Sequence, residues 1–147
     1  MAKSKRTWIL AAAVVVAVGA GMGVAVCRAQ ELPNAVVEIA WDKEPCAYCH
    51  MHVGDPAFAG QIQTKDGMVY NFDDPGCLLR YASEHDASRF HAVYLHENKK
   101  AGRWLTQPQT GFVRVSPTPM GYGFGAVDKS TPGAIAWDQA RAEVAKR

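Results

Sequence analysis

Residues 58–82, FAGQIQTKDGMVYNFDDPGCLLRYA, contain the patterns that decide the fold. Apolar and polar residues alternate on both sides of Lys65-Asp66-Gly67, which is typical of a tight turn joining two antiparallel strands. Asp73-Asp74-Pro75 then marks a helix start, with an aspartate cap before a proline at the first helical position. Apolar residues follow at helical spacing until about Ser83. The stretch therefore predicts two strands followed by a helix.

Further elements are predicted on both sides of this stretch. The alternating residues 90–96 give a strand after the helix, and residues 36–41 give a first strand before the hairpin. The remaining predictions are short strands near Trp104, at 112–115 and at 124–127, and a final helix that starts at 130–132. We predict an α+β domain built from two strand-strand-helix-strand units, the second of which ends in a helix and leaves its last strand unassigned.

The first 29 residues are typical of an export signal or a membrane anchor. Lys3, Lys5 and Arg6 precede residues 8–27, which carry no charge and are just long enough to span a bilayer. Three outcomes remain open: a retained anchor, cleavage after Ala29, or lipidation of Cys27. All three outcomes place the rest of the chain outside the cytoplasm. We expect a periplasmic protein that is attached to the membrane by the N-terminal segment or, as a lipoprotein, by a lipid on Cys27. We expect residues 30–35 to be a tether and residues 36–147 to form the domain.

Charge and cysteine content narrow the function of the exported part. Beyond residue 29 the chain has 12 Lys and Arg against 14 Asp and Glu, so its formal charge of −2 gives no indication of nucleic-acid binding. Three cysteines remain there, Cys46, Cys49 and Cys77. An odd number of cysteines outside the cytoplasm leaves at least one thiol without a disulfide partner.

Residues 46–51, CAYCHM, carry the candidate metal ligands. Thiolates at the spacing of Cys46 and Cys49 favour Cu(I), zinc or iron–sulfur centres, and the thioether of Met51 adds a further soft ligand. Met120, in a loop rich in Pro and Gly, could complete the set from a distant part of the chain. The sequence therefore predicts a Cu(I) site with Cys46, Cys49, Met51 and Met120 as ligands, and His50 as an optional addition.

Asp73, Asp74 and Cys77 are additional candidates in the middle of the chain. The two carboxylates could bind a metal as hard ligands, although capping of the helix explains at least one of them. Cys77 lies near the predicted helix start, where its thiol pKa should be lowered unless the side chain is deeply buried. Its helical spacing with Tyr81 is equally consistent with a buried structural cysteine.

Two other functions use the same cysteine pair. Cys46-x-x-Cys49-His50 has the spacing of covalent haem attachment, with His50 as proximal ligand and Met120 as axial partner of a haem c electron carrier. The residues that follow alternate like strands, whereas helices usually surround a haem attached in this way. The pair could also form a local disulfide or catalyse thiol–disulfide exchange, which leaves Met51 and Met120 without a role.

Three separated segments resemble the nitrous-oxide-reductase accessory protein family, NosL: CAYCHM at 46–51, NFDDPGCLLRY at 71–81 and SPTPMGYGFGAV at 116–127. The similarity covers roughly residues 36–128. It implies an α+β fold distantly similar to organomercurial lyase and a periplasmic protein, often a lipoprotein, that binds Cu(I). Such a copper chaperone is not an enzyme. With a copper-delivering membrane transporter it supplies copper to apo nitrous oxide reductase, a step in maturation for denitrification.

The resemblance also implies roles for individual residues. By position, Cys46, Cys49 and Met51 match the family's cysteine-methionine motif, and Met120 matches its loop methionine. Asp73, Asp74 and Cys77 match a middle motif that is expected to shape the site. His50 is a departure, because the family commonly carries glycine at this position. The histidine at this position is what makes the motif match the Cys-x-x-Cys-His pattern of covalent haem attachment.

Overall fold

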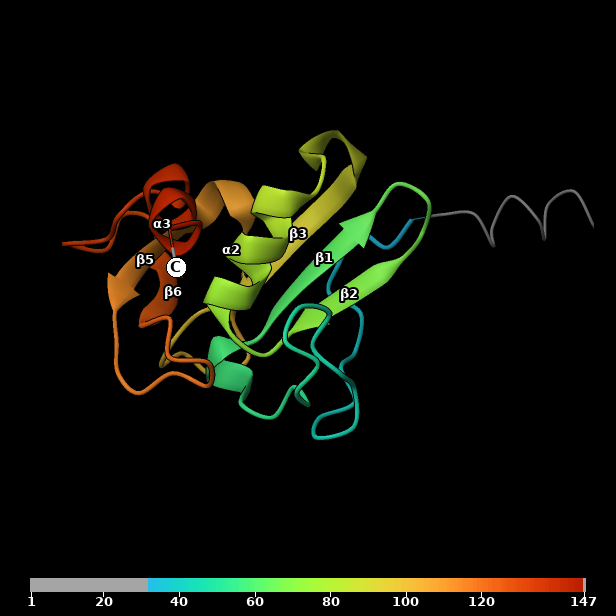
Figure 1. Cartoon of the computed structure of the whole chain (residues 1–147), viewed down its shortest axis with the longest axis horizontal. Helices are drawn as coiled ribbons and strands as arrows, with labels where there is room; N and C mark the ends of the chain where they lie inside the picture. Colours follow the sequence, from blue (N-terminus) through green and yellow to red (C-terminus); the bar gives the residue numbers. More distant parts are fainter. Residues whose placement is uncertain (1–31, 147) are drawn as a thin grey trace, which may run out of the picture. The chain divides into compact units, whose positions relative to one another are not determined.

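The computed structural model describes residues 32–146, and the unit from Pro33 onward contains all the elements described below. The strands and helices are β1 (Gly60–Thr64), β2 (Val69–Phe72), α2 (Pro75–Glu84), β3 (Phe90–His96), β4 (Trp104–Thr106), β5 (Thr110–Arg114), β6 (Phe124–Asp128) and α3 (Trp137–Val144) (Figure 1). Short 3-10 turns lie at η1 (Pro56–Phe58), η2 (Ala87–Arg89) and η3 (Gln107–Gln109). The predicted α+β fold is confirmed.

The larger sheet has four antiparallel strands in the order β2-β1-β3-β4. The predicted hairpin is confirmed: Ile62 pairs with Tyr70, and Gly67 has the positive φ of +85° that glycine adopts readily in a tight turn. Helix α2 follows β2 directly, and β3 then returns beside β1. The first predicted strand-strand-helix-strand unit is therefore complete.

The second unit comprises the β5-β6 hairpin and α3, and among residues 32–146 no strand follows α3. The prediction that the last helix starts at 130–132 is wrong, because α3 begins at Trp137. Gly133 has a φ of +79°, which interrupts a helix, and the backbone of Ile135 exchanges two hydrogen bonds with Phe112 on β5. This pairing keeps the chain extended until just before α3.

Residues 36–41 do not form the predicted strand. The backbone at the start of this segment pairs with side chains. The amide of Gln61 accepts from Val37 N and donates to Val37 O, both at 2.9 Å, and Gln63 donates to the carbonyl oxygen of Ala35, just before the segment, at 2.8 Å. A glutamine amide offers the same donor and acceptor as a peptide group. Gln61 and Gln63 are consequently buried on the sheet face that their alternation predicted to be polar.

Helix α2 packs on the opposite face of the sheet, where it buries Leu78 and Leu79. Gly60 on β1 allows the close approach, since a Cβ there would lie 2.5 Å from Leu78 Cδ1. Helix α3 contacts both α2 and β5, which joins the two units into one core. The N-terminal turn of α2 therefore lies at the end of β2, where loops from both units meet it.

The predicted signal or anchor at residues 1–29 lies outside the described residues. Within residues 32–146, no helix is long and apolar enough to cross a membrane.

Candidate metal centre

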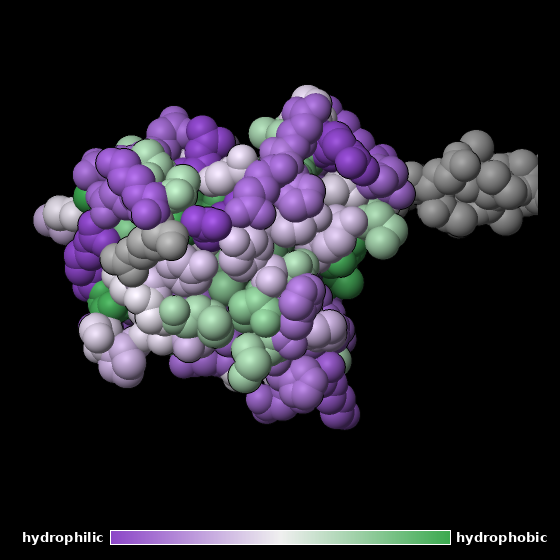
Figure 2. Space-filling model, viewed as in Figure 1, coloured by the Kyte–Doolittle hydropathy of each residue, from purple (hydrophilic) through white to green (hydrophobic). Residues whose placement is uncertain are grey.

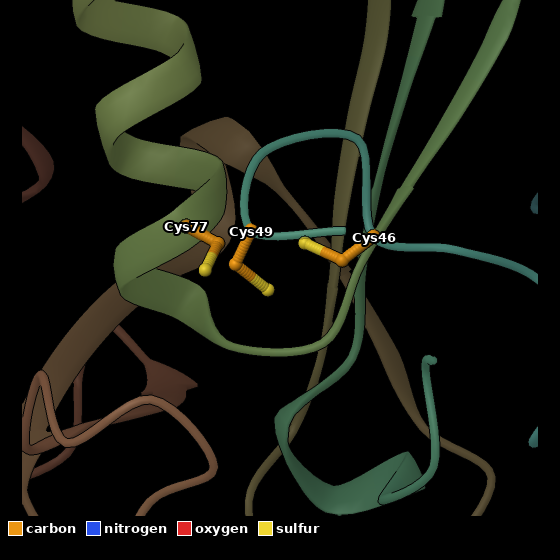
Figure 3. A group of neighbouring side chains, drawn as sticks. All are labelled: Cys46, Cys49 and Cys77. Carbon is orange, nitrogen blue, oxygen red and sulfur yellow. The ribbon is translucent and has the colours of Figure 1, made fainter. Parts of the chain in front are cut away.

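Three cysteine side chains meet beside the first turn of α2 (Figure 3). Cys46 and Cys49 come from the loop before η1, and Cys77 comes from α2. Their Sγ atoms all lie within 4.8 Å of one another, and all three are free thiols. An ion with three sulfur ligands in a plane at about 2.3 Å separates the sulfurs by about 4.0 Å. The cluster therefore fits a single metal ion.

The loop that carries Cys46 and Cys49 closes on itself. Cys46 N donates to Met51 O at 2.7 Å, and His50 N donates to Cys46 O at 3.0 Å. This tight turn places His50 at a φ of +63°, in the left-handed region that glycine occupies without strain. Ala47 N also donates to Asn71 O at 2.8 Å, which ties the loop to the end of β2. As a result both thiols face α2.

Asp73 and Asp74 hold the segments that surround the cluster. Asp73 accepts a hydrogen bond from Gly54 N at 3.0 Å, which fixes the end of the cysteine loop. Asp74 caps α2 by accepting from Gly76 N at 2.7 Å, and its second oxygen accepts from Met120 N at 2.9 Å. Burial raises the pKa of the Asp74 carboxyl. The contacts of both carboxylates fit the predicted role in shaping the site.

The three thiols differ in burial and in acidity. Cys46 and Cys77 are fully buried, whereas Cys49 is half-buried. A hydrogen bond from the Cys77 thiol, helped by main-chain N–H groups, lowers the pKa of Cys46 to about 5. The same interaction raises the pKa of Cys77, and burial raises the pKa of Cys49. Cys77 is therefore the buried cysteine that the sequence left as an alternative, but it is also a member of the cluster.

The other predicted ligands lie on the solvent side. Met51 is 59% exposed and Met120 is 40% exposed, and His50 is also exposed. The hydrogen bond between Met120 N and Asp74 places the loop at 116–123 at the same end of α2 as Cys77. The structure thus unites Cys46, Cys49 and Cys77 in one group. Met51 lies on the loop of Cys46 and Cys49, and the Met120 loop is hydrogen-bonded to Asp74 at the start of α2. The role of both thioethers as ligands stays a prediction.

Tyr122 is a contributor that the sequence did not indicate. A Cβ at position 76 would clash with the Tyr122 ring, so the ring lies directly against the first turn of α2. Burial raises the pKa of Tyr122, and the nearby Cys77 acts in the same direction. Figure 2 shows pale to apolar surface around this end of α2, with strongly hydrophilic residues elsewhere on the same face. The only signal in the sequence was a glycine within a predicted helix.

Tyr48, which lies between Cys46 and Cys49, is a second contributor that the sequence did not reveal. Its hydroxyl accepts from Arg80 Nε at 2.9 Å and donates to Glu84 Oε1 at 3.2 Å. Arg80 and Glu84 belong to the same helix as Cys77. The cysteine loop is therefore attached to α2 by side chains as well as by the shape of the core.

A scan against protein-family models, a search of curated proteins and a search of solved structures each found no match for this chain. The resemblance to the NosL family consequently rests on the three segments of sequence and their spacing. Assignment of a function depends on the chemistry of the cluster itself.

Proposed function

We propose that this protein binds one Cu(I) ion outside the cytoplasm and transfers it to a partner protein. The observation that carries the proposal is the meeting of three thiols from two separate segments, with every Sγ within 4.8 Å of the others. Thiolates are soft ligands and favour Cu(I) among the metals available to an exported protein. A pre-existing thiolate at Cys46, with a pKa of about 5, supplies the first ligand at neutral pH.

The number of donors favours Cu(I) over zinc. Structural zinc sites are almost always four-coordinate, with Cys, His or carboxylate ligands. Within the described part of the chain, the group of such residues around the cluster has three members. Cu(I) accepts two or three soft ligands, and the thioethers of Met51 and Met120 are on the loops next to the cluster.

Transfer by ligand exchange is supported by the unequal exposure of the sulfurs. Cys46 and Cys77 are buried, Cys49 is half-buried, and Met51 and Met120 are exposed. An ion that leaves the thiols one at a time has thioethers available nearer to the solvent. Such a path suits delivery to another protein better than a closed four-ligand cage does, and it needs no catalytic step. On this proposal the protein is not an enzyme.

The NosL resemblance gives this function a specific partner. We propose that the recipient is apo nitrous oxide reductase and that a membrane transporter supplies the copper. Two features support the resemblance: Cys77, from the middle segment, joins the cluster, and position 50 has the backbone conformation that glycine favours. The family commonly carries glycine there, so the departure at His50 preserves the shape of the loop.

The burial of Cys46 weighs against the haem alternative. Covalent attachment joins both cysteines of the motif to the edge of a porphyrin. The Cys46 side chain is fully buried and accepts a hydrogen bond from the Cys77 thiol, while His50 lies in an exposed turn at a positive φ. Thiol–disulfide exchange is favoured by the low pKa of Cys46, but the reactive cysteine of such enzymes is normally accessible. Metal binding accounts for all three thiols.

A titration with a competing Cu(I) chelator tests the proposed function. The reduced full chain should bind one Cu(I) per molecule, and Cys46→Ser, Cys49→Ser and Cys77→Ser should each weaken binding. Met68→Leu is the matched control, because it removes the sulfur of an exposed side chain on the β1-β2 hairpin. Weak binding that none of the three substitutions changes would contradict the proposal. A covalently bound haem in protein from an exporting host would establish the alternative.

A further inference from the structure

The hydrogen bonds of Tyr48 connect the cysteine loop to the helix that carries Cys77. The hydroxyl of Tyr48 accepts from Arg80 Nε at 2.9 Å and donates to Glu84 Oε1 at 3.2 Å. Both partners are fixed in turn, since Arg80 forms an ion pair with Glu84 at 3.3 Å and donates to Val144 O at 3.3 Å. The hydroxyl group therefore joins the loop to α2, and Arg80 extends the connection to the end of α3.

The position of these residues on α2 relates the contact to the metal site. Arg80 and Glu84 follow Cys77 by three and seven residues, so all three lie on one side of the helix. In the loop, Tyr48 follows Cys46 by two residues and directly precedes Cys49. One side of α2 therefore carries both the residues that bind the Tyr48 hydroxyl and the third thiol of the cluster, Cys77. The Tyr48 contact sets the separation between the loop thiols and Cys77.

The two loop thiols are held to different extents. Cys46 is fully buried in the core, and the neighbouring Ala47 N is bonded to Asn71 O on β2. Cys49 is half-buried and follows Tyr48 directly. If the Tyr48 hydroxyl loses its partners, the loop can move away from α2 at Cys49 while Cys46 stays in place. The contact therefore controls the outermost thiol of the cluster.

We infer that Tyr48, Arg80 and Glu84 form a latch that controls how fast the bound metal is released. The inference rests on the proposed function, because it concerns metal held by the three thiols. Closed, the latch keeps Cys49 next to Cys46 and Cys77, and the ion has three sulfur ligands. Open, it leaves the ion on the two buried thiols and frees one coordination position for an incoming ligand. Tyr48 is thus a positioning residue that does not touch the metal.

The test is the rate at which Cu(I) passes from the loaded full chain to an excess of competing chelator. Tyr48→Phe removes the hydroxyl and retains the ring, and it should speed release by about tenfold, equivalent to ~1.4 kcal/mol in the barrier. Tyr94→Phe, which removes a phenol from β3 in the sheet, is the matched control and should release copper at the wild-type rate. Equal rates for Tyr48→Phe and the wild type would overturn the inference.

A second pair of variants separates the latch from general loss of structure. Glu84 is 47% exposed, so its replacement leaves the core intact. Glu84→Ala removes the acceptor of the Tyr48 hydroxyl and should speed release, whereas Glu84→Gln retains an acceptor oxygen and should restore slow release. Equal release rates for Glu84→Ala and Glu84→Gln would contradict a role for this hydrogen bond.

Alkylation of the metal-free, reduced chain distinguishes failure of the latch from failure of the proposed function. In Tyr48→Phe, Cys49 should react several-fold faster with iodoacetamide than in the wild type, while Cys46 stays slow. If the wild type binds no Cu(I), the proposed function fails and the control of metal release fails with it. If it binds Cu(I) but neither release nor alkylation responds to Tyr48→Phe, only the latch is wrong.

Discussion

The protein places its two kinds of sulfur in different surroundings. The thiols of Cys46 and Cys77 are fully buried at the start of α2, and Cys49 is half-buried beside them. The thioethers of Met51 and Met120 lie on the loops around this group and are 59% and 40% exposed. On the proposed function, the buried thiols determine the affinity for the ion, and the exposed thioethers assist its entry and exit.

Protonation is the physical reason for such a division. A thiolate binds a soft metal strongly, but protons compete with the metal for the sulfur. At Cys46, hydrogen bonds lower the thiol pKa to about 5, so the sulfur is already ionised at neutral pH. A thioether carries no proton at any accessible pH and binds more weakly. It can therefore remain in water as a transient ligand without a change in charge.

Loss of a buried thiol should have the largest effect. Cys46→Ser removes the ligand that is already a thiolate, and the affinity for Cu(I) should fall by more than about 100-fold. This loss exceeds the roughly 10- to 100-fold loss of metal affinity that follows when a residue that hydrogen-bonds a metal ligand is replaced. Competition with a chelator measures the change, with Met68→Leu as the control. A loss of less than tenfold would mean that the thiols are not the principal ligands.

Cu(I) affinity should depend steeply on pH. Of the three thiols, Cys46 has a pKa of about 5 and is ionised at neutral pH, while the pKa values of Cys49 and Cys77 are raised. Binding must then displace two protons, and affinity should rise about 100-fold per pH unit between roughly pH 6 and 8.

Below about pH 5, Cys46 is also protonated and the dependence should steepen. Cys49→Ser removes one of the two displaced protons, so its affinity should rise only about tenfold per pH unit. An affinity that does not change with pH between 6 and 8 would place the metal on the thioethers.

Asp74 connects the buried group with the Met120 loop, and its replacement should reduce stability. Asp74→Ala removes the cap of α2 and the acceptor of Met120 N, which should cost about 2–3 kcal/mol of unfolding free energy. Asp74→Asn retains one acceptor oxygen for Gly76 N and should cost about half as much. Urea unfolding of the metal-free chain measures both. Equal costs would show that the cap at Gly76 N contributes nothing, and an Asn variant as stable as the wild type would show that the contact with Met120 contributes nothing.

The thioethers should give the smallest change in affinity. Met51→Leu and Met120→Leu conserve apolar volume, and each should weaken Cu(I) binding by about tenfold or less. The same variants should slow the passage of copper to an acceptor protein. Met68→Leu is the matched control, since Met68 is 52% exposed on the β1-β2 hairpin. A loss greater than about 100-fold would make the thioethers primary ligands and reverse the assignment.

Local patterns in the sequence were sufficient to predict the parts of the fold that depend on neighbouring residues. The hairpin around Gly67 and the capped start of α2 are examples, because turn and cap chemistry act over a few residues. Residues 36–41 were mispredicted as a strand. The backbone of Val37 and of the preceding Ala35 pairs with the side chains of Gln61 and Gln63, more than 20 residues away. No periodicity encodes a pairing of that kind.

The candidate site also contains residues that local sequence predicted and residues whose role depends on packing. Cys46 and Cys49 are neighbours in the sequence and were predicted as ligands, but the helical spacing of Cys77 was equally consistent with a structural cysteine. Its place in the cluster depends on how the loop packs against α2. The contacts of Tyr48 with Arg80 and Glu84 also depend on that packing, and a tyrosine between two cysteines has no distinctive pattern.

X-ray absorption of the Cu(I)-loaded chain tests the central claim most directly, because it counts the atoms bound to copper. The account predicts one Cu(I) per chain, bound only by sulfur at about 2.3 Å, with one sulfur fewer in Cys77→Ser. Binding through nitrogen or oxygen, or a sulfur count that Cys77→Ser leaves unchanged, would contradict it.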